Sequence, residues 1–242
     1  MTESRTPQTR AASPDGATGS TGTTAAPDSG PRRGPRPVPE RPGATTPSTS
    51  ERILDAALVS FGDRGYEPTS LDALAAGLEV RKQTILYWYP SKEALLEAVI
   101  DRSAAELSEA LEASLASAGT GWGRVEAVVR SVFRLAVRRP ELLGLVREMG
   151  RLGAPAATRF IGALEPLVER AAVFLGSEMD AGHMRRHEPR LLLLAIYSSV
   201  IGMITEVDVL RAMGEEPTAR SLVKRRTEIL EFLRSALVTD TA

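Results

Sequence analysis

The chain has 242 residues and a formal net charge of −1, from 30 Lys and Arg against 31 Asp and Glu. This nearly neutral net charge does not indicate a nucleic-acid partner, so nucleic-acid binding has to be argued from local clusters of charge. Cysteine is absent, which excludes disulfides, thiolate catalysis and most structural zinc sites. The first residues are polar and lack the apolar run of a signal peptide, so we expect a cytoplasmic protein.

Residues 1–47 differ in composition from the rest of the chain. They hold nine of the sixteen prolines and almost no large apolar side chains, so they bury too little surface to offset the entropy of ordering. We predict a disordered arm. Its basic residues lie on a stretch that prolines keep extended, a form suited to a DNA minor groove; the alternative is a solvated tail that never orders. These residues are Arg32, Arg33, Arg36 and Arg41.

An amphipathic helix is predicted over residues 49–64. Ser48 and Glu51 have the spacing of a capping box, and Gly65 is placed to end the helix in a left-handed turn. From this point onward apolar residues recur at helical spacing, and no sustained two-residue alternation indicates strands. The sequence therefore predicts an all-helical protein behind a flexible arm.

A second, short helix follows, and a third begins almost at once. Thr69 and Asp72 repeat the capping-box spacing in front of the second helix. The third is expected from about Arg81 to Trp88. Two short helices joined by a tight turn have the geometry of a helix-turn-helix, in which the second helix enters the DNA major groove.

Residues 51–97 resemble the DNA-binding domain of the TetR family of transcriptional repressors. The matching stretches are ILDAALVSFGDRGYEPTSLDALA and TILYWYPSKEALLEAV, and their order, spacing and final Pro-Ser-Lys-Glu are specific in combination. The resemblance implies an N-terminal three-helix helix-turn-helix domain over residues 48–97 and a larger helical effector-binding and dimerisation domain over 98–238. It implies a ligand-responsive repressor that binds a palindromic operator as a homodimer, without enzymatic activity or cofactor.

Two residues depart from the family pattern. Glu79 stands in the turn where the family usually has glycine, and a non-glycine residue in a left-handed conformation costs on the order of 1 kcal/mol. The turn is therefore either reshaped or strained. Leu86 stands where the family often has a tyrosine that contacts the DNA backbone, and Tyr87 is a candidate to compensate.

Helical spacing divides the third helix into a core face and an outer face. Leu86 and Tyr89 fall near the apolar side. The resemblance puts Tyr89 in the place of the family's buried phenylalanine, which implies that it packs against the first helix. Arg, Lys and Gln suit the base edges of the major groove, whereas Lys92 would meet a phosphate beside a helix start that Ser91 caps. The alternative, an aromatic run that is only core, stays open. The predicted DNA-binding residues are Thr69, Arg81, Lys82, Gln83, Thr84, Tyr87, Trp88 and Lys92.

The stretch from 191 to 204 is nearly apolar on every side. It is too short to cross a bilayer, which takes roughly twenty residues, so we expect no membrane partner. A soluble helix of this kind must be covered all round, and a second copy of the chain is the predicted cover, with a monomer as the alternative. The predicted dimer interface is Leu192, Ile196, Val200, Leu222, Ile229, Leu233 and Ala236.

A small-molecule effector is expected in the same region, although each candidate residue could equally be ordinary core or surface. The candidates are Met149, Arg151, Phe160, Leu164, Tyr197 and Met203, with Glu206 as a further polar group. The rival function classes are a helical adaptor for protein contacts and an enzyme. Asp180, His183 and His187 have metal-compatible spacing, but we expect them on a polar helix end and predict no metal site.

Overall fold

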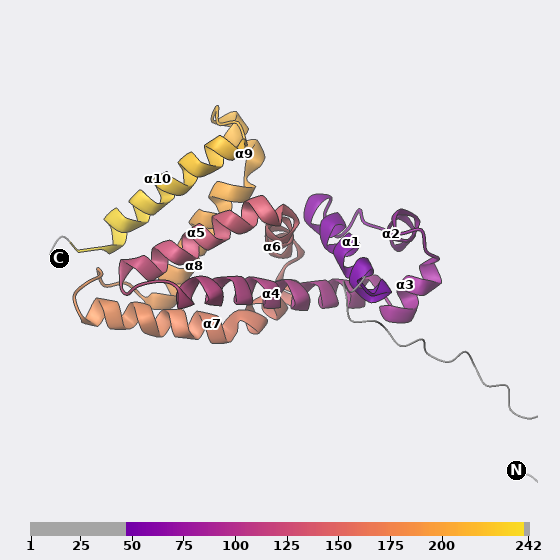
Figure 1. The fold of residues 1–242 in the computed structure, drawn as a ribbon, viewed down its shortest axis with the longest axis horizontal. Coiled ribbons are helices and arrows are strands. Elements are labelled where there is room, and N and C mark those ends of the chain that lie inside the picture. The colour runs from indigo at the N-terminus through magenta and orange to yellow at the C-terminus, as the bar shows by residue number, and fades with distance from the viewer. Residues whose placement is uncertain (1–46, 240–242) are drawn as a thin grey trace, which may run out of the picture. The chain divides into compact units, whose positions relative to one another are not determined.

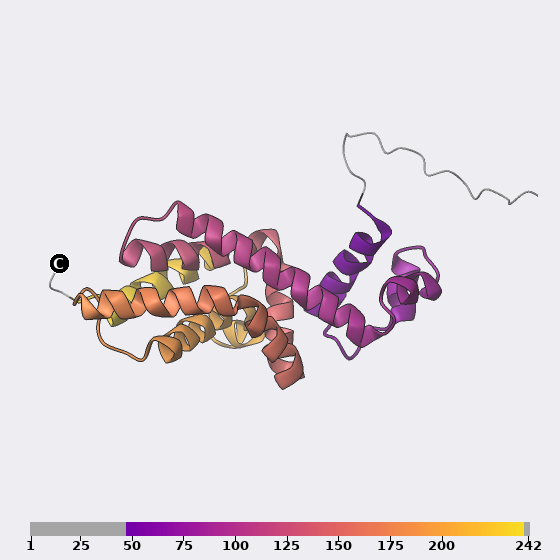
Figure 2. The same cartoon turned by 90° about the horizontal axis from the view of Figure 1, so that it is seen from below.

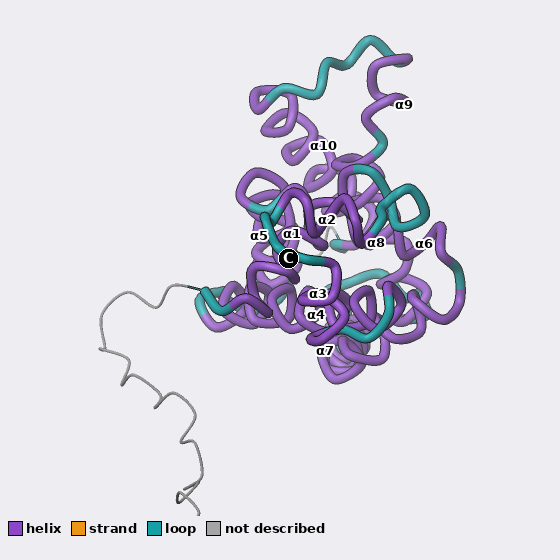
Figure 3. Tube along the Cα trace, turned by 90° about the vertical axis from the view of Figure 1, so that its right-hand side faces the viewer, coloured by secondary structure: helices purple, strands orange, loops and turns teal. Residues whose placement is uncertain are grey.

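The computed structural model describes residues 47–239, so the predictions for the arm concern residues outside the described part. Within it, ten α-helices occur and no strand (Figures 1 and 3), which confirms the all-helical fold. The helices are α1 (Thr49–Asp63), α2 (Leu71–Gly77), α3 (Lys82–Trp88), α4 (Lys92–Ala116), α5 (Trp122–Arg138), α6 (Pro140–Leu152), α7 (Ala154–Asp180), α8 (Pro189–Thr205), α9 (Val207–Ala212) and α10 (Ala219–Leu237).

The capping box predicted for α1 is present. The Ser48 hydroxyl accepts a hydrogen bond from the Glu51 amide at 3.2 Å, and the Ser48 amide donates to the Glu51 carboxylate at 2.6 Å. This bond to the cap amide lowers the pKa of Glu51. Just beyond the helix, Gly65 has φ +95°, the left-handed conformation expected for a glycine that ends a helix.

One cluster of buried side chains joins α1, α2, α3, α4, α6 and α7. Its members include Phe61 of α1, Ile85 of α3, Val99 of α4 and Phe160 of α7. Figure 2 shows α4 extending from the helices of the N-terminal region to lie beside α7. The predicted domain boundary after residue 97 falls inside α4 and inside this cluster, and it stays a prediction.

Helix α1 packs directly on α6. Gly62 of α1 and Gly144 of α6 meet at the crossing, where the backbones of the two helices touch. Leu145 and Val146 of α6 are buried in the shared core beside this contact. Two glycines at one crossing allow a helix separation that side chains would otherwise prevent.

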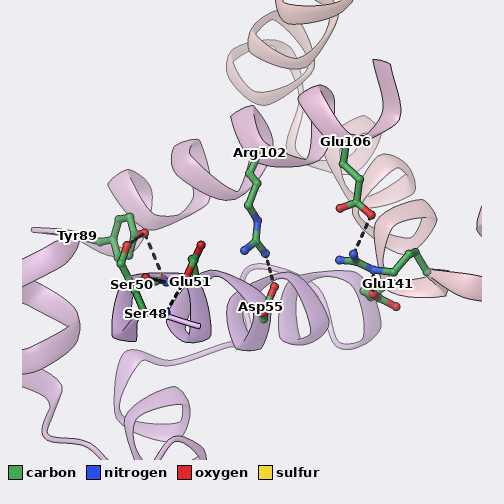
Figure 4. Close-up of polar contacts among 9 residues, drawn as sticks. Ser48, Ser50, Glu51, Asp55, Tyr89, Arg102, Glu106 and Glu141 are labelled. Carbon is green, nitrogen blue, oxygen red and sulfur yellow. Dashed lines mark hydrogen bonds and ion pairs between the residues drawn. The ribbon is translucent and has the colours of Figure 1, made fainter. Parts of the chain in front are cut away.

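Ion pairs tie α4 to both of these helices (Figure 4). Arg102 of α4 lies 2.9 Å from Asp55 of α1. Glu106, one turn further along α4, accepts a hydrogen bond at 2.7 Å from Arg139, which precedes the first residue of α6. Charged groups, in addition to the apolar core, thus connect the middle of α4 to the start of α6 and to the outer side of α1.

Helices α5, α8 and α10 enclose a second apolar cluster. Phe133 of α5, Val200 of α8 and Ile229 of α10 are among its buried members. Arg225 of α10 is also buried, and its guanidinium donates to the Met203 carbonyl at the end of α8. Burial lowers the pKa of Arg225. Among residues 47–239, no helix combines the length and apolarity needed to span a bilayer.

Helix α7 continues through Pro166 from Ala154 to Asp180. The proline therefore does not end the helix. A proline inside a helix removes one backbone hydrogen bond and crowds the preceding turn. Packing of α7 along α4 and α8 keeps the remaining turns helical despite this cost.

Candidate nucleic-acid interface

The turn between α2 and α3 is tight and contains a strained residue. Glu79 has φ +57° and is the one non-glycine residue with positive φ in the described part of the chain. The following amide, that of Val80, donates to the Ala75 carbonyl at 3.0 Å, which closes the end of α2. The turn therefore keeps its left-handed geometry although it lacks glycine. Of the two outcomes expected from the sequence, a reshaped turn or a strained one, the structure shows the strained one. It sets the angle at which α3 leaves α2.

Helix α3 has one buried face and one exposed face. Ile85 is fully buried, whereas Tyr87 is 81% exposed and Trp88 is also exposed. Arg81 and Gln83 lie on the exposed side, and Thr84 is half-buried. Most of the predicted contact residues are thus brought together on one accessible surface. A short helix whose buried residue anchors it and whose polar and aromatic residues face outward fits a DNA groove.

Lys82, which is predicted to contact base edges in the major groove, forms an ion pair with a neighbouring acidic residue. Its ammonium lies 2.9 Å from the Asp72 carboxylate in the first turn of α2. Asp72 is largely exposed, so the attraction is weak and solvent-screened. This pair orients Lys82 in the free protein and places a negative charge at the predicted DNA surface.

The aromatic run is divided between surface and core. Tyr87 and Trp88 pack edge to face, with ring centroids 5.5 Å apart, on the exposed side of α3. Tyr89 is half-buried, and its hydroxyl shares a 2.8 Å hydrogen bond with the hydroxyl of Ser50 in α1. The placement of Tyr89 against the first helix is therefore confirmed (Figure 4). The exposed pair is available for contact with a partner.

Thr69 departs from its predicted roles. Ser70, not Thr69, caps α2, because its hydroxyl accepts from the Ala73 amide at 3.1 Å. Thr69 is only 6% exposed, and its hydroxyl donates to the Gly65 carbonyl at 2.8 Å. Its side chain holds the turn between α1 and α2 together, so we remove it from the set of DNA-contacting side chains.

Lys92 lies at the first position of α4, which Ser91 caps as predicted, with a 3.0 Å hydrogen bond from the Ala94 amide. The Lys92 ammonium donates to the Glu67 carbonyl at 3.1 Å and stands 4.1 Å from the ring centroid of Tyr66. Sequence reasoning missed Tyr66. An aromatic residue directly after the glycine that ends α1 was the available signal.

Comparison with known proteins agrees with this geometry. Residues 53–99 match the family model described as bacterial regulatory proteins, tetR family. The HTH-type transcriptional regulator RutR of Escherichia coli K12 is 27% identical over 151 residues, which cover 61% of this chain and 69% of RutR. Residues 53–99 therefore match the DNA-binding region of the TetR family, and the relatives found are transcriptional regulators rather than enzymes.

Solved structures of TetR-like proteins share the fold over most of the chain. A transcriptional regulator from Saccharomonospora viridis, in complex with choline, superposes with a TM-score of 0.65 at 17% identity and covers 78% of this chain and 97% of that one. FadR from Bacillus subtilis, in complex with stearoyl-CoA, gives 0.64 at 19% identity and covers 76% and 97%. The N-terminal helix-turn-helix and the larger helical C-terminal region are those of the TetR fold.

The six predicted effector contacts do not surround one cavity. Met149, Phe160 and Leu164 are buried in the large cluster, whereas Met203 packs against the second one. Tyr197 is exposed on α8. The other polar candidates, Arg151 and Glu206, also lie on the surface. An open groove of about 650 Å³ runs along α4 and α7, and none of the six lines it.

The predicted dimer residues mostly face the protein's own core. Val200, Ile229 and Leu233 are buried between α5, α8 and α10, and Leu192, Ile196 and Leu222 are half-buried against the same cluster. Their assignment to a dimer surface is therefore corrected: they pack within one chain. Helical spacing identified faces that are buried, but it could not show whether the same chain or a second copy buries them. Of the predicted set, only Ala236 is exposed.

A different face of α8 is exposed and apolar. Leu191 and Leu194 are the largest side chains on it, and Leu194 is 56% exposed. Ala195 and Ser198 complete the face at helical spacing, and Tyr197 flanks it. On α10 the large exposed apolar side chains are Val223 and Phe232.

The possible metal ligands do not converge. His183 contacts the Glu178 carboxylate at 3.0 Å, and Asp180 pairs with Arg186 at 3.2 Å. Over residues 47–239, no three metal-ligating side chains come together in one group.

Proposed function

We propose that the protein is a ligand-responsive repressor that binds a palindromic DNA operator as a homodimer. The observation that carries this function is the exposed face of α3, where Arg81, Gln83, Tyr87 and Trp88 surround the buried anchor Ile85. Arg and Gln side chains match acceptors and donors of guanine and adenine in the major groove. The aromatic pair and Lys92 would lie against the phosphate backbone. The expected place of action is the cytoplasm.

The proposed dimer uses the exposed face of α8. Leu191, Leu194 and Ala195 combine large apolar with small side chains, a composition that favours close packing of two helices and leaves an unfavourable surface in a monomer. Val223 and Phe232 extend the apolar surface onto α10. A two-fold dimer presents two α3 helices to successive major grooves, and this predicts a palindromic site.

The proposed effector binds within residues 98–238, the region that forms most of the helical C-terminal part. The complexes of similar folds with choline and stearoyl-CoA support a small-molecule ligand without indicating its chemistry here. Met149, Phe160 and Leu164 are the surviving candidates because they share one cluster. A ligand changes DNA affinity only if it binds one arrangement of the DNA-binding helices more tightly than the other.

The test of DNA recognition is selection of binding sites from genomic fragments with the purified protein. We expect an enriched palindrome, with binding greatly weakened in Gln83→Ala and Tyr87→Ala. Thr227→Ala, an exposed substitution on α10, serves as the matched control and should bind normally. A folded protein that enriches no sequence over random DNA would contradict the proposal.

The test of the dimer is sedimentation of a charged variant. Leu194→Glu should sediment as a monomer and bind the operator more weakly, because one subunit engages only one half-site. Val137→Glu introduces the same charge at an exposed position of α5 and should remain dimeric. Unchanged dimerisation of Leu194→Glu would show that another face forms the interface.

A further inference from the structure

Tyr66 connects three segments that are distant in the sequence. It lies in the turn between α1 and α2, where its amide donates to the Glu148 carboxylate of α6 at 2.8 Å. Its hydroxyl donates to Glu93 in the first turn of α4 at 3.1 Å. The Lys92 ammonium stands 4.1 Å from the centroid of its ring. One residue therefore links α6 to the end of α4 that carries a proposed phosphate contact.

The Tyr66 ring restricts where the Lys92 ammonium can lie. Lysine has a long, flexible side chain, and an aromatic face attracts its charge while leaving other N–H groups free for a phosphate. One N–H group of the ammonium donates to the Glu67 carbonyl at 3.1 Å, and this second contact further restricts the position of the ammonium. Tyr66 also packs against the buried ring of Phe61, with centroids 5.4 Å apart, so its own position is fixed by the core.

The carboxylate of Glu93 is held by the same ring. Glu93 follows Lys92 directly, and a freely rotating carboxylate at that position would repel an approaching phosphate. Its hydrogen bond from the Tyr66 hydroxyl is part of what lowers the pKa of Glu93, after its own backbone and Ser91. The hydroxyl thus restrains the acid while the ring face positions the base.

Glu148 fixes Tyr66 to α6. Its side chain is buried, with a residue exposure of 5%, and it comes so close to the turn that a Cβ at Gly65 would lie 3.0 Å from its carboxylate. Arg151, an exposed residue one turn along α6, lies 3.3 Å from the other carboxylate oxygen. A buried carboxylate that accepts from a backbone amide is a directional contact, which a shift of α6 would break.

We propose that Tyr66, fixed by Glu148, is a positioning residue that holds Lys92 ready for contact with a DNA phosphate. The inference rests on the proposed DNA contact of Lys92. Because α6 belongs to the region proposed to hold the effector, Tyr66 offers a route by which movement of α6 would reach the phosphate contact.

The test is the salt dependence of operator affinity in a double-variant cycle. Lys92→Ala should reduce the slope of log K against log salt by about 1.8, since each of two subunits loses a phosphate contact worth about 0.9. Tyr66→Leu should reduce it nearly as much, and the double variant should match Lys92→Ala alone. Additive losses, or an unchanged slope in Tyr66→Leu, would overturn the proposal.

Two ring variants separate positioning from folding. Tyr66→Phe keeps the aromatic face and should keep most of the slope, whereas pentafluorophenylalanine at the same position keeps the ring shape, reverses the charge of its face and should lose it. Equal slopes for these two variants would also overturn the proposal. Phe174→Leu is the matched control, because it removes a second cation–aromatic pair, with Arg124 at 5.2 Å, outside α1 to α4.

The role of Glu148 is tested by Glu148→Ala, with Arg151→Ala as control. Removal of the carboxylate should lower the slope as Tyr66→Leu does, while removal of its exposed partner should leave the slope unchanged. A normal slope in Glu148→Ala would show that α6 does not fix Tyr66. Failure of the unaltered protein to bind any operator would instead contradict the proposed function.

Discussion

Gly62 of α1 and Gly144 of α6 lie against each other with no room for a methyl group on either. A Cβ at Gly144 would lie 2.4 Å from the Gly62 carbonyl oxygen, and one at Gly62 would lie 2.3 Å from the carbonyl oxygen of Glu141. Both distances are far below van der Waals contact, and both neighbouring atoms belong to backbones. The two helices are therefore in direct main-chain contact and move apart only if the core around them opens.

Gly144→Ala is expected to lower the free energy of unfolding by about 1–3 kcal/mol, the usual cost of overpacking, even though alanine is the better helix former. Urea denaturation followed by circular dichroism measures this change. Gly162→Ala is the matched control, because a Cβ there meets no atom within 4 Å. It should raise stability by up to about 1 kcal/mol. Equal effects of the two substitutions would disprove the close contact.

Glu79→Gly should stabilise the protein. Glu79 holds φ +57°, a conformation that costs a non-glycine residue on the order of 1 kcal/mol. Part of this gain is offset by the larger backbone entropy of glycine in the unfolded chain. Thermal unfolding should show a rise of a few degrees for the glycine variant and none for Glu79→Ala, which retains the strain. A lower melting temperature for Glu79→Gly would show that the conformation is not strained.

Asp72→Asn should strengthen operator binding. The substitution releases Lys82 from its 2.9 Å ion pair and removes a negative charge from the surface that approaches DNA. We expect a several-fold lower dissociation constant at low salt and a smaller gain at high salt, measured by fluorescence anisotropy. Asp180→Asn also breaks an ion pair, at 3.2 Å to Arg186, but at the end of α7, and should not change affinity.

Alkaline pH should destabilise the protein through Tyr66. Burial, followed by the hydrogen bond to Glu93, raises the pKa of Tyr66 to about 12. Between pH 10 and 12 the unfolded chain loses this proton while the folded protein keeps it, so stability falls as pH rises. The extra loss relative to Tyr66→Phe should reach at most about 2–3 kcal/mol, measured by urea denaturation across that range. Parallel pH profiles of the two proteins would contradict the prediction.

Deletion of residues 1–42 tests the basic arm. The four arginines of the arm would add phosphate or minor-groove contacts, so their removal should weaken operator affinity and flatten its salt dependence. Substitution of the same four arginines by glutamine is the matched variant, because it keeps the length of the arm. Identical affinities at two salt concentrations would show that the arm does not contact DNA.

Local chemistry made the N-terminal helices predictable. The Ser48–Glu51 capping box and the glycine at position 65 act between residues close in sequence, so their spacing alone located α1. The same reasoning failed by one residue at α2, because Thr69 and Ser70 both carry a hydroxyl that can cap a helix. Only the three-dimensional contact of Thr69 with the Gly65 carbonyl selects Ser70 as the cap.

Helical spacing in the sequence could not distinguish residues buried in the core of one chain from residues at an interface between two chains. Ile229 and Leu233 have the spacing of a buried stripe, and they are buried by α5 and α8 of the same chain. Leu194, in a helix that is apolar on nearly every side, could not be distinguished from its covered neighbours. The contact of Tyr66 with Glu148 spans 82 residues of sequence and has no local signature.

The shared core has a consequence for how this protein can be divided. The DNA-binding helices bury Phe61 and the Gly62 surface of α1 in a cluster that also contains Leu145 and Met149 of α6. A fragment ending at residue 99 would lose this cover and expose the apolar side of α1 to water. The DNA-binding segment is therefore expected to fold only together with α6, and its folding stability is a property of the whole helical chain.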